Sequence, residues 1–234
     1  MLCLLLLACG LPESDTQPVS SAPVAVAPVD EAPPETAPVA APVWRVEVVE
    51  LTPQVRAEMR GVSWHEGCPV PLDALREIHM THHTFEGDVA TGVLVVADSV
   101  VEPVVAAFQA AFEDEFPIRT MRPIRTFGGD DGRSMEADNT SAFNCRRVTG
   151  GTGWSQHSFG TAIDVNPVEN PYVSRSGSVS PSAGSAFVDR TRTDNRAMLS
   201  AESPLVISLV AQGWGWGGQW RSLKDYQHVS QSGR

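Results

Sequence analysis

The sequence predicts an α+β fold, with a small antiparallel sheet and flanking helices. Segments with strand character and segments with helix character are mixed along the chain, and they lack the strand–helix–strand rhythm of parallel α/β sheets. Hydrophobic residues make up 42% of the 234 residues and charged residues 19%. This composition is typical of a globular protein and excludes disorder of the whole chain.

The N-terminal region differs in composition from the rest. Up to residue 44 it contains five acidic residues, no Lys or Arg, and eight of the 18 prolines. The apolar run Met1–Ala8 is too short to span a bilayer, and Leu6-Leu7-Ala8-Cys9 resembles a bacterial lipobox, in which the signal is cut before an acylated cysteine. We expect residues 1–9 to be an export signal, with Cys9 as the lipidation site.

A Pro/Ala-rich segment follows at residues 10–43 and offers no amphipathic face. We expect a disordered tether; its Pro-rich part, residues 18–43, would reach roughly 80 Å as extended polyproline II at ~3.1 Å per residue. The alternative is an unfolded leader without a tethering role.

The folded domain is expected over residues 44–234. Its first strand is predicted at 46–51, after which Thr52 and Pro53 supply an N-cap and a first-turn proline for a short helix at 54–60.

A strand pair and a long helix are expected next. Strands at 78–85 and 92–97 flank a turn at 86–88, and Asp98 is a candidate cap for a helix that ends near residue 116. The apolar face of this helix is expected to consist of Val101, Val104, Val105, Phe108, Ala111 and Phe112.

The remaining elements are expected to be shorter. A strand at 118–126 precedes a polar loop at 128–139, a turn feeds a strand within 155–165, and a Ser/Gly loop spans 174–184. Ser203 and Pro204 open a helix at 205–212 that Gly213 closes, and the Trp-rich stretch 214–229 has strand character.

The charge balance narrows the range of partners. The chain has 17 basic and 28 acidic residues, a net charge of −11, and residues 45–234 alone carry −6. A surface of this sign repels phosphate backbones, so we expect no nucleic-acid partner.

The strongest chemical signal is a set of metal-ligating residue types near the C-terminus. His157 and Asp164 are seven residues apart, with Gly160 allowing a turn between them, and His228 follows later. Two imidazoles and one carboxylate are a common catalytic zinc set that leaves a fourth position for water. Asp225, three residues before His228, is placed to act as a general base, although a solvated turn acid is the alternative.

The pattern around these residues is Ser-x-His-x-x-Gly-x-Ala-x-Asp, followed by Asp-x-x-His. It resembles the zinc D-alanyl-D-alanine carboxypeptidase and L-alanyl-D-glutamate endopeptidase family of bacterial cell-wall enzymes, which share a hedgehog-type fold. The resemblance covers roughly residues 64–229. Further segments that carry it are Phe116-Pro117-Ile118, Ser134-Met135, the run from Asn139 to Arg146, Asn166-Pro167, Asn170-Pro171-Tyr172 and the run from Gly213 to Trp220.

The resemblance implies a role for each matched residue. His157, Asp164 and His228 would hold Zn²⁺, and Asp225 would be the catalytic acidic residue. Arg146 matches the arginine that polarises the scissile carbonyl or holds a substrate carboxylate, although Arg147 is adjacent and a structural ion pair is the alternative. Ser155 and Trp220 are the expected substrate-binding residues. Val229 departs from relatives that carry Phe there, which should alter pocket packing rather than metal binding.

Other candidate motifs are weaker. The histidines in His79–His83 lack a matching carboxylate or Cys, and a strand with polar positions explains them. Gly128–Gly132 lacks the ligand pattern of an EF-hand loop, so we expect a polar turn. Gly150–Gly153 lacks the Lys-Ser/Thr of a phosphate loop and is expected to form a flexible rim beside the zinc site.

Two cysteines remain outside the leader region. We expect a disulfide between Cys68 and Cys145, because an exported protein permits one; two buried thiols are the alternative.

The expected function is zinc-dependent hydrolysis of peptidoglycan stem peptides by a monomer in the cell envelope, anchored to the membrane through Cys9. A D-alanyl-D-alanine carboxypeptidase is favoured, with an L-alanyl-D-glutamate endopeptidase next. The alternative is a non-catalytic zinc-binding module of the cell wall, which would not need Asp225 or Arg146.

Overall fold

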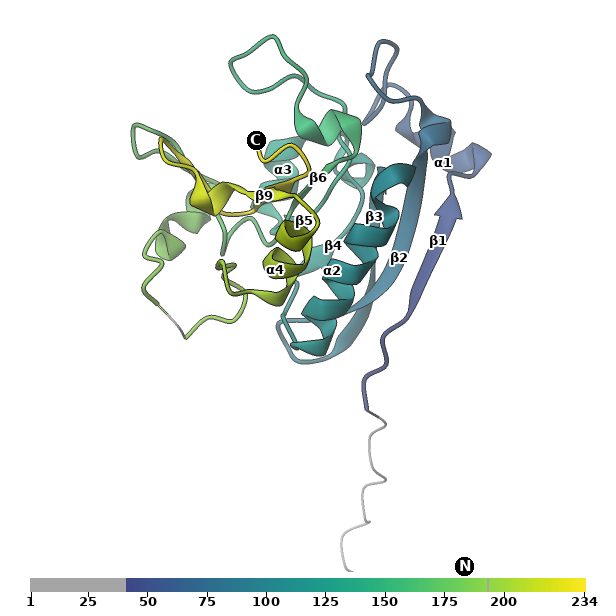
Figure 1. The fold of residues 1–234 in the computed structure, drawn as a ribbon. Helices are drawn as coiled ribbons and strands as arrows, with labels where there is room; N and C mark the ends of the chain where they lie inside the picture. The colour runs from purple at the N-terminus through teal and green to yellow at the C-terminus, as the bar shows by residue number, and fades with distance from the viewer. Residues whose placement is uncertain (1–40, 193) are drawn as a thin grey trace, which may run out of the picture. The chain divides into compact units, whose positions relative to one another are not determined.

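The computed structural model describes residues 41–192 and 194–234 (Figure 1). The expected export signal, Cys9 and nearly all of the expected tether therefore lie outside the described residues. Val43 already contacts the folded region, because its carbonyl accepts a hydrogen bond from the Thr81 hydroxyl at 3.3 Å. The α+β prediction is confirmed, with several small sheets and helices rather than one sheet.

The largest sheet comes from the first half of the chain. Its strands β1 (Val46–Glu50), β2 (Leu75–His83) and β3 (Val89–Ala97) are antiparallel in the order β1-β2-β3. The β2–β3 pair extends from Leu75↔Ala97 to His83↔Val89, so β2 and β3 each begin three residues before the predicted start. In the part added to β2, Leu75 and Glu77 are buried and Arg76 between them is half-buried, as expected for alternating side chains in a strand.

Two helices accompany this sheet. Helix α1 (Pro53–Met59) begins as predicted, because the Thr52 side chain accepts a hydrogen bond from the Val55 amide and proline occupies the first turn. Helix α2 spans Val101–Glu113.

The predicted cap of α2 is wrong. Asp98 lies in a 3-10 turn before the helix and its carboxylate pairs with Arg76 at 3.1 Å. The helix ends at Glu113, before the predicted end, and Glu115 adopts a left-handed conformation with φ of 54°.

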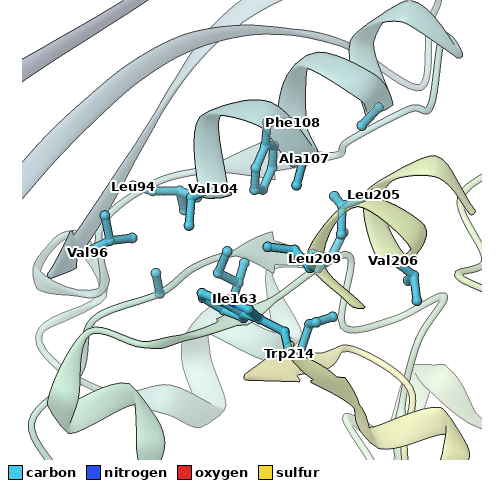
Figure 2. Packing of buried hydrophobic residues seen from close by; sticks show 14 of the residues in the cluster. Leu94, Val96, Val104, Ala107, Phe108, Ile163, Leu205, Val206, Leu209 and Trp214 are labelled. Atoms are coloured by element: carbon cyan, nitrogen blue, oxygen red, sulfur yellow. The ribbon is translucent and has the colours of Figure 1, made fainter. Parts of the chain in front are cut away.

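The main core lies between α2, the sheet and helix α4 (Pro204–Ala211) (Figure 2). Helix α2 packs against both β2 and α4. Each of the labelled core residues is at most 4% exposed, and they include Leu94, Val104, Phe108, Ile163, Leu205, Leu209 and Trp214. Burial of this surface holds the C-terminal part of the chain against the N-terminal sheet.

The segment between α2 and the candidate ligands differs from its prediction. The expected strand at 118–126 is reduced to β4 (Thr120–Met121), because Pro123 has no amide hydrogen for a sheet ladder. Strand β4 pairs in parallel with β5 (Asn139–Thr140). The expected polar loop at 128–139 contains helix α3 (Asp131–Glu136), which begins where the Asp130 side chain accepts a hydrogen bond from the Arg133 amide.

The C-terminal half forms two further small sheets. The first has the order β6-β11-β9 and consists of β6 (Ala162–Asp164), β11 (His228–Ser230) and β9 (Gly215–Trp216). The second has the order β10-β7-β8 and consists of β10 (Lys224–Asp225), β7 (Tyr172–Val173) and β8 (Val179–Ser180). The expected strand character of 214–229 is thus divided among three short strands. The expected loop at 174–184 contributes β8 and part of a 3-10 helix. Among the described residues, no helix has the length and apolarity needed to cross a membrane.

Candidate metal centre and surrounding pocket

Three predicted ligands converge although the chain separates them by up to 71 residues. Asp164 ends β6 and His228 begins β11, and these two residues are directly opposite each other in the antiparallel register. His157 lies on the 3-10 helix Gln156–Phe159 just before β6. All three side chains are buried, with 4–6% exposure.

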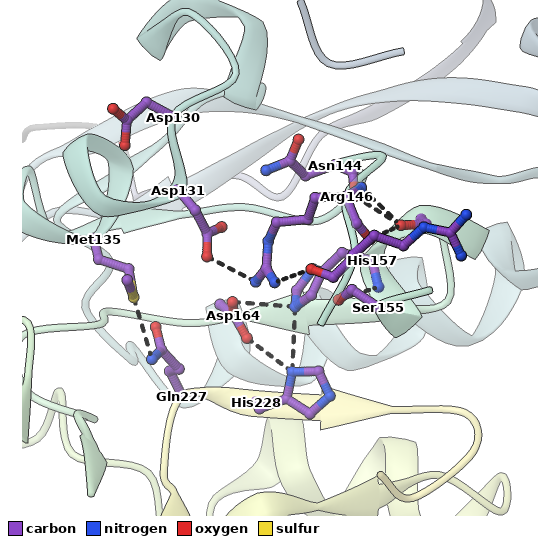
Figure 3. Close-up of polar contacts among 12 residues, drawn as sticks. Asp130, Asp131, Met135, Asn144, Arg146, Ser155, His157, Asp164, Gln227 and His228 are labelled. Atoms are coloured by element: carbon purple, nitrogen blue, oxygen red, sulfur yellow. Dashed lines mark hydrogen bonds and ion pairs between the residues drawn. The ribbon is translucent and has the colours of Figure 1, made fainter. Parts of the chain in front are cut away.

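The facing atoms of the three residues lie close together (Figure 3). His157 Nε2 is 3.1 Å from Asp164 Oδ2, His228 Nδ1 is 3.0 Å from Asp164 Oδ1, and the two ring nitrogens are 3.2 Å apart. The opposite nitrogens are held by backbone carbonyls. His157 Nδ1 donates to Ala142 at 2.7 Å and His228 Nε2 donates to Arg234 at 3.2 Å.

These outer hydrogen bonds fix which nitrogen of each ring carries the proton. In neutral rings, the protons on His157 Nδ1 and His228 Nε2 leave a lone pair on each facing nitrogen. Two lone pairs and a carboxylate would then face one another in a buried site, which is unfavourable without a cation. The donor set and its outer hydrogen bonds therefore fit a divalent metal, and zinc in particular.

The electrostatics of the site agree with this fit. Burial alone would raise the pKa of Asp164, but His157 and His228 hold it well below its usual range. Burial opposes a charged His228, yet the hydrogen bond and charge of Asp164 outweigh it and raise the pKa of His228 to about 9. Positive charge between the histidines and Asp164 is thus strongly favoured, whether a proton or a metal ion supplies it.

Gly160 permits the short connection between His157 and Asp164. Its φ is +69°, and a Cβ there would lie 2.6 Å from the Ala97 amide nitrogen. The Ala97 amide also donates a hydrogen bond to the Gly160 carbonyl at 3.0 Å. The turn between the two ligands is therefore packed directly onto the end of β3.

Asp225 lies at the end of β10, opposite Tyr172 in β7. Its backbone packs against Gly217, where a Cβ would lie 2.4 Å from the Asp225 carbonyl oxygen. Burial raises the pKa of Asp225 to about 6, with His228 opposing the shift, and its Oδ1 has no hydrogen-bond partner among the described residues. A half-buried carboxylate with a raised pKa beside the candidate ligands has the properties of a general base.

The two adjacent arginines point to different places. Arg146 contacts Asp131 at 2.7 Å between Nη2 and Oδ2, in the same pocket as the three ligands. Arg147 instead stacks on Trp154 at 3.7 Å from the ring centroid and donates to the Thr152 carbonyl. The geometry places Arg146, rather than Arg147, beside the candidate metal centre.

A pocket of about 540 Å³ surrounds these groups. Its lining includes every residue that the sequence singled out for metal binding, catalysis or substrate binding: Arg146, Ser155, His157, Asp164, Trp220, Asp225 and His228. Ser155 accepts a hydrogen bond from the His157 amide, and the Trp220 ring lies 5.6 Å from the His228 ring between centroids. Residues 150–153, which were expected to form a rim beside the site, lie near this pocket, because Val148 before them and Trp154 after them line it.

Several lining residues had no role assigned to them from the sequence. Asp131 and Met135 come from α3, which was expected to be a loop, and Gln227 and Arg234 flank His228 on either side. The Asp130 cap before Arg133 was the available signal for α3. No comparable local signal pointed to the Arg234 carbonyl, which depends on how the chain turns after β11.

The predicted disulfide is present between Cys68 and Cys145, with a Cα–Cα distance of 6.0 Å. It joins the segment after α1 to the residue immediately before Arg146. His65 lies beside it, with Nε2 at 3.7 Å from Cys145 Sγ, and the bonded sulfurs explain why these three residues cluster. A disulfide indicates a location outside the cytoplasm.

Comparison with known families supports the interpretation of the site. Residues 149–231 match the family model described as D-alanyl-D-alanine carboxypeptidase. The matched segment contains His157, Asp164, Asp225 and His228, whereas Arg146 and both bonded cysteines lie before it. No curated protein and no solved structure matches the chain.

Proposed function

We propose that this chain, whose residues 149–231 match the family model described as D-alanyl-D-alanine carboxypeptidase, is a zinc-dependent peptidase acting on peptidoglycan stem peptides. The observation that carries the proposal is the convergence of His157 Nε2, Asp164 and His228 Nδ1 in a pocket that also contains Asp225 and Arg146. A terminal D-alanyl-D-alanine bond is the first candidate substrate and an L-alanyl-D-glutamate bond the second.

The positions of the residues in the pocket support the following proposed roles. Zinc bound by the three ligands would supply Lewis acidity, which acidifies water and polarises a carbonyl. Asp225 takes a proton from the attacking water, while Arg146 donates hydrogen bonds either to the oxygen of the scissile carbonyl or to a carboxylate of the substrate. As the carbon–nitrogen bond breaks, Asp225 gives the proton to the leaving amine. Ser155 and Trp220 contact the peptide.

Replacing Asp225 by Asn tests the proposal most directly. The variant keeps the shape of the side chain but cannot accept the proton, so turnover should fall by roughly 10²–10⁴-fold. Zinc content by elemental analysis should stay the same as in the wild type. The assay is mass analysis of the products from muropeptides, which also identifies the bond that is cleaved.

The matched control is Asp88→Asn, at an exposed turn between β2 and β3. It should leave turnover unchanged. Full activity of zinc-loaded Asp225→Asn would eliminate the proposed base. A wild type that binds zinc but releases no product would favour a non-catalytic zinc-binding module instead.

Anchoring through Cys9 is a separate part of the proposal and is supported by the lipobox-like Leu6-Leu7-Ala8-Cys9. Cells labelled with radioactive palmitate should incorporate label into the wild type and into Cys3→Ala, but not into Cys9→Ala. Label that persists in Cys9→Ala would rule out lipidation at this residue.

A further inference from the structure

Asp131 and Arg146 form an ion pair on the wall of the pocket that holds the candidate metal ligands. The distance between Arg146 Nη2 and Asp131 Oδ2 is 2.7 Å, and the side chains are 29% and 26% exposed. Both residues line the pocket, and Figure 3 shows the guanidinium between Asp131 and the His157–Asp164 group. The pair is therefore accessible from the space that a substrate would occupy.

The backbone on the Arg146 side of the pair is firmly held. The Arg146 amide donates to the Ser158 hydroxyl at 2.9 Å, and that hydroxyl donates back to the Arg146 carbonyl at 2.7 Å. The preceding residue, Cys145, is bonded to Cys68. Only the side chain of Arg146 is free to change partners.

The guanidinium of Arg146 has few other partners. Its Nη1 donates to the Arg147 carbonyl at a long 3.4 Å, and its Nε is buried without a partner among the described residues. Asp131 thus provides the one charged partner that the described residues give to Arg146. Arg146 is therefore already paired with a carboxylate before any substrate arrives.

This arrangement has a consequence for substrate choice. Each bidentate edge of the guanidinium includes Nη2, the nitrogen that Asp131 contacts, so a peptide carboxylate that binds Arg146 in a bidentate manner shares this nitrogen with Asp131 and meets its negative charge. A neutral amide group at the same place has no negative charge for Asp131 to repel. Asp131 therefore disfavours an acidic group beside Arg146 relative to a neutral one.

We propose that Asp131 is a specificity-determining residue, which competes with the substrate carboxylate for Arg146 and so shifts the pocket towards neutral peptide groups. The inference deepens the proposed peptidase function and rests on it for the identity of the substrate. Its basis is the geometry of the pair.

Binding measurements can isolate this effect. The probes are acetyl-D-alanyl-D-alanine and its C-terminal amide, titrated by calorimetry into zinc-loaded protein that carries Asp225→Asn, so that neither peptide is consumed. In this background Asp131→Asn should tighten binding of the acid about tenfold and change binding of the amide by less than about twofold.

Asp130→Asn is the matched control, because it removes the same charge one residue away. Asn caps helices as well as Asp does, and Asp130 contacts Arg133 rather than Arg146. It should leave both affinities within about twofold. With Arg146→Gln also present, Asp131→Asn should lose its effect on the acid, because the two residues act as a pair.

Three results would overturn the proposal: equal changes for the acid and the amide, an equal effect of Asp130→Asn, or no binding of the acid to any variant. The experiment also distinguishes failure of this proposal from failure of the proposed peptidase function. A wild type that cleaves no muropeptide while Asp131→Asn still selectively tightens the acid would refute hydrolysis and retain the specificity role of Asp131.

Discussion

Glu169, a buried carboxyl group away from the candidate metal centre, makes stability depend on pH. Glu169 and Asp138 are 5% and 7% exposed. Burial, together with a hydrogen bond and charge from Asp138, raises the pKa of Glu169 from 4.5 to about 8, and the charge of Arg119 opposes the shift. Its Oε2 has no hydrogen-bond partner among the described residues. The folded protein therefore keeps a proton that the unfolded chain loses near pH 4.5.

Because the pKa of Glu169 is higher in the folded protein than in the unfolded chain, ionisation of Glu169 lowers the stability of the protein as pH rises. Between pH 5 and 8 the unfolded chain binds fewer protons at this position, so the free energy of unfolding falls with pH. Gln at position 169 stays neutral. In Glu169→Gln the decrease in unfolding free energy between pH 5 and 8 should therefore be smaller than in the wild type by about 1–2 kcal/mol, as measured by urea unfolding at each pH.

The exposed Glu202→Gln serves as the control and should keep the pH dependence of the wild type. A Glu169→Gln curve parallel to that of the wild type would show that Glu169 ionises normally in the folded protein.

At the scale of elements, the turn between His157 and β6 connects the candidate metal centre to the first sheet. Gly160 adopts a φ of +69° and leaves no room for a Cβ against Ala97. Gly177 has a similar φ of +85°, but a Cβ there would have no neighbour within 4 Å. Replacing each glycine by Ala therefore distinguishes two free-energy costs: backbone strain, which both variants have, and a steric clash, which only the Gly160 variant has.

Gly160→Ala should therefore destabilise the protein more than Gly177→Ala. Backbone strain alone costs about 1 kcal/mol, and the clash with Ala97 should raise the total for Gly160→Ala to about 3 kcal/mol. Denaturant unfolding measures both values.

A displaced turn also moves His157, so zinc affinity should fall for Gly160→Ala and stay unchanged for Gly177→Ala. Equal stability losses in the two variants would contradict the close packing of Gly160 against β3.

At the scale of the whole molecule, one covalent bond links parts that are distant in sequence. Cys68 and Cys145 are 77 residues apart, and the loop between them contains the first sheet's β2 and β3, helix α2 and helix α3. Cross-linking such a loop reduces the entropy of the unfolded chain, which corresponds to roughly 4 kcal/mol in the chain-entropy model.

The double variant Cys68→Ser/Cys145→Ser should therefore lose roughly 4 kcal/mol of unfolding free energy in denaturant titrations. A dithiol reductant should lower wild-type stability by a similar amount and leave the double variant unaffected. A wild type that is insensitive to the reductant while mass analysis shows the bond broken would refute the stabilising role.

The local sequence was sufficient to predict the structural features that depend only on residues close together in the chain. The Thr52 cap, the proline starts of α1 and α4 and the turn at Gly160 follow from backbone preferences that act within a few residues. The predictions of a strand at 118–126 and of a loop at 128–139 were wrong, because strand pairing and the formation of a six-residue helix depend on contacts outside each segment.

By itself, the sequence predicted the chemistry of the candidate centre: two imidazoles and a carboxylate with a nearby acid, in a pattern that resembles a cell-wall peptidase family. Tertiary structure alone decided which ring nitrogens face inward, that Arg146 rather than Arg147 enters the pocket, and that Asp131 meets it there. The physical reason is that residue types carry reactivity, whereas the proximity of side chains far apart in sequence comes from burial of the core between α2, α4 and the sheets.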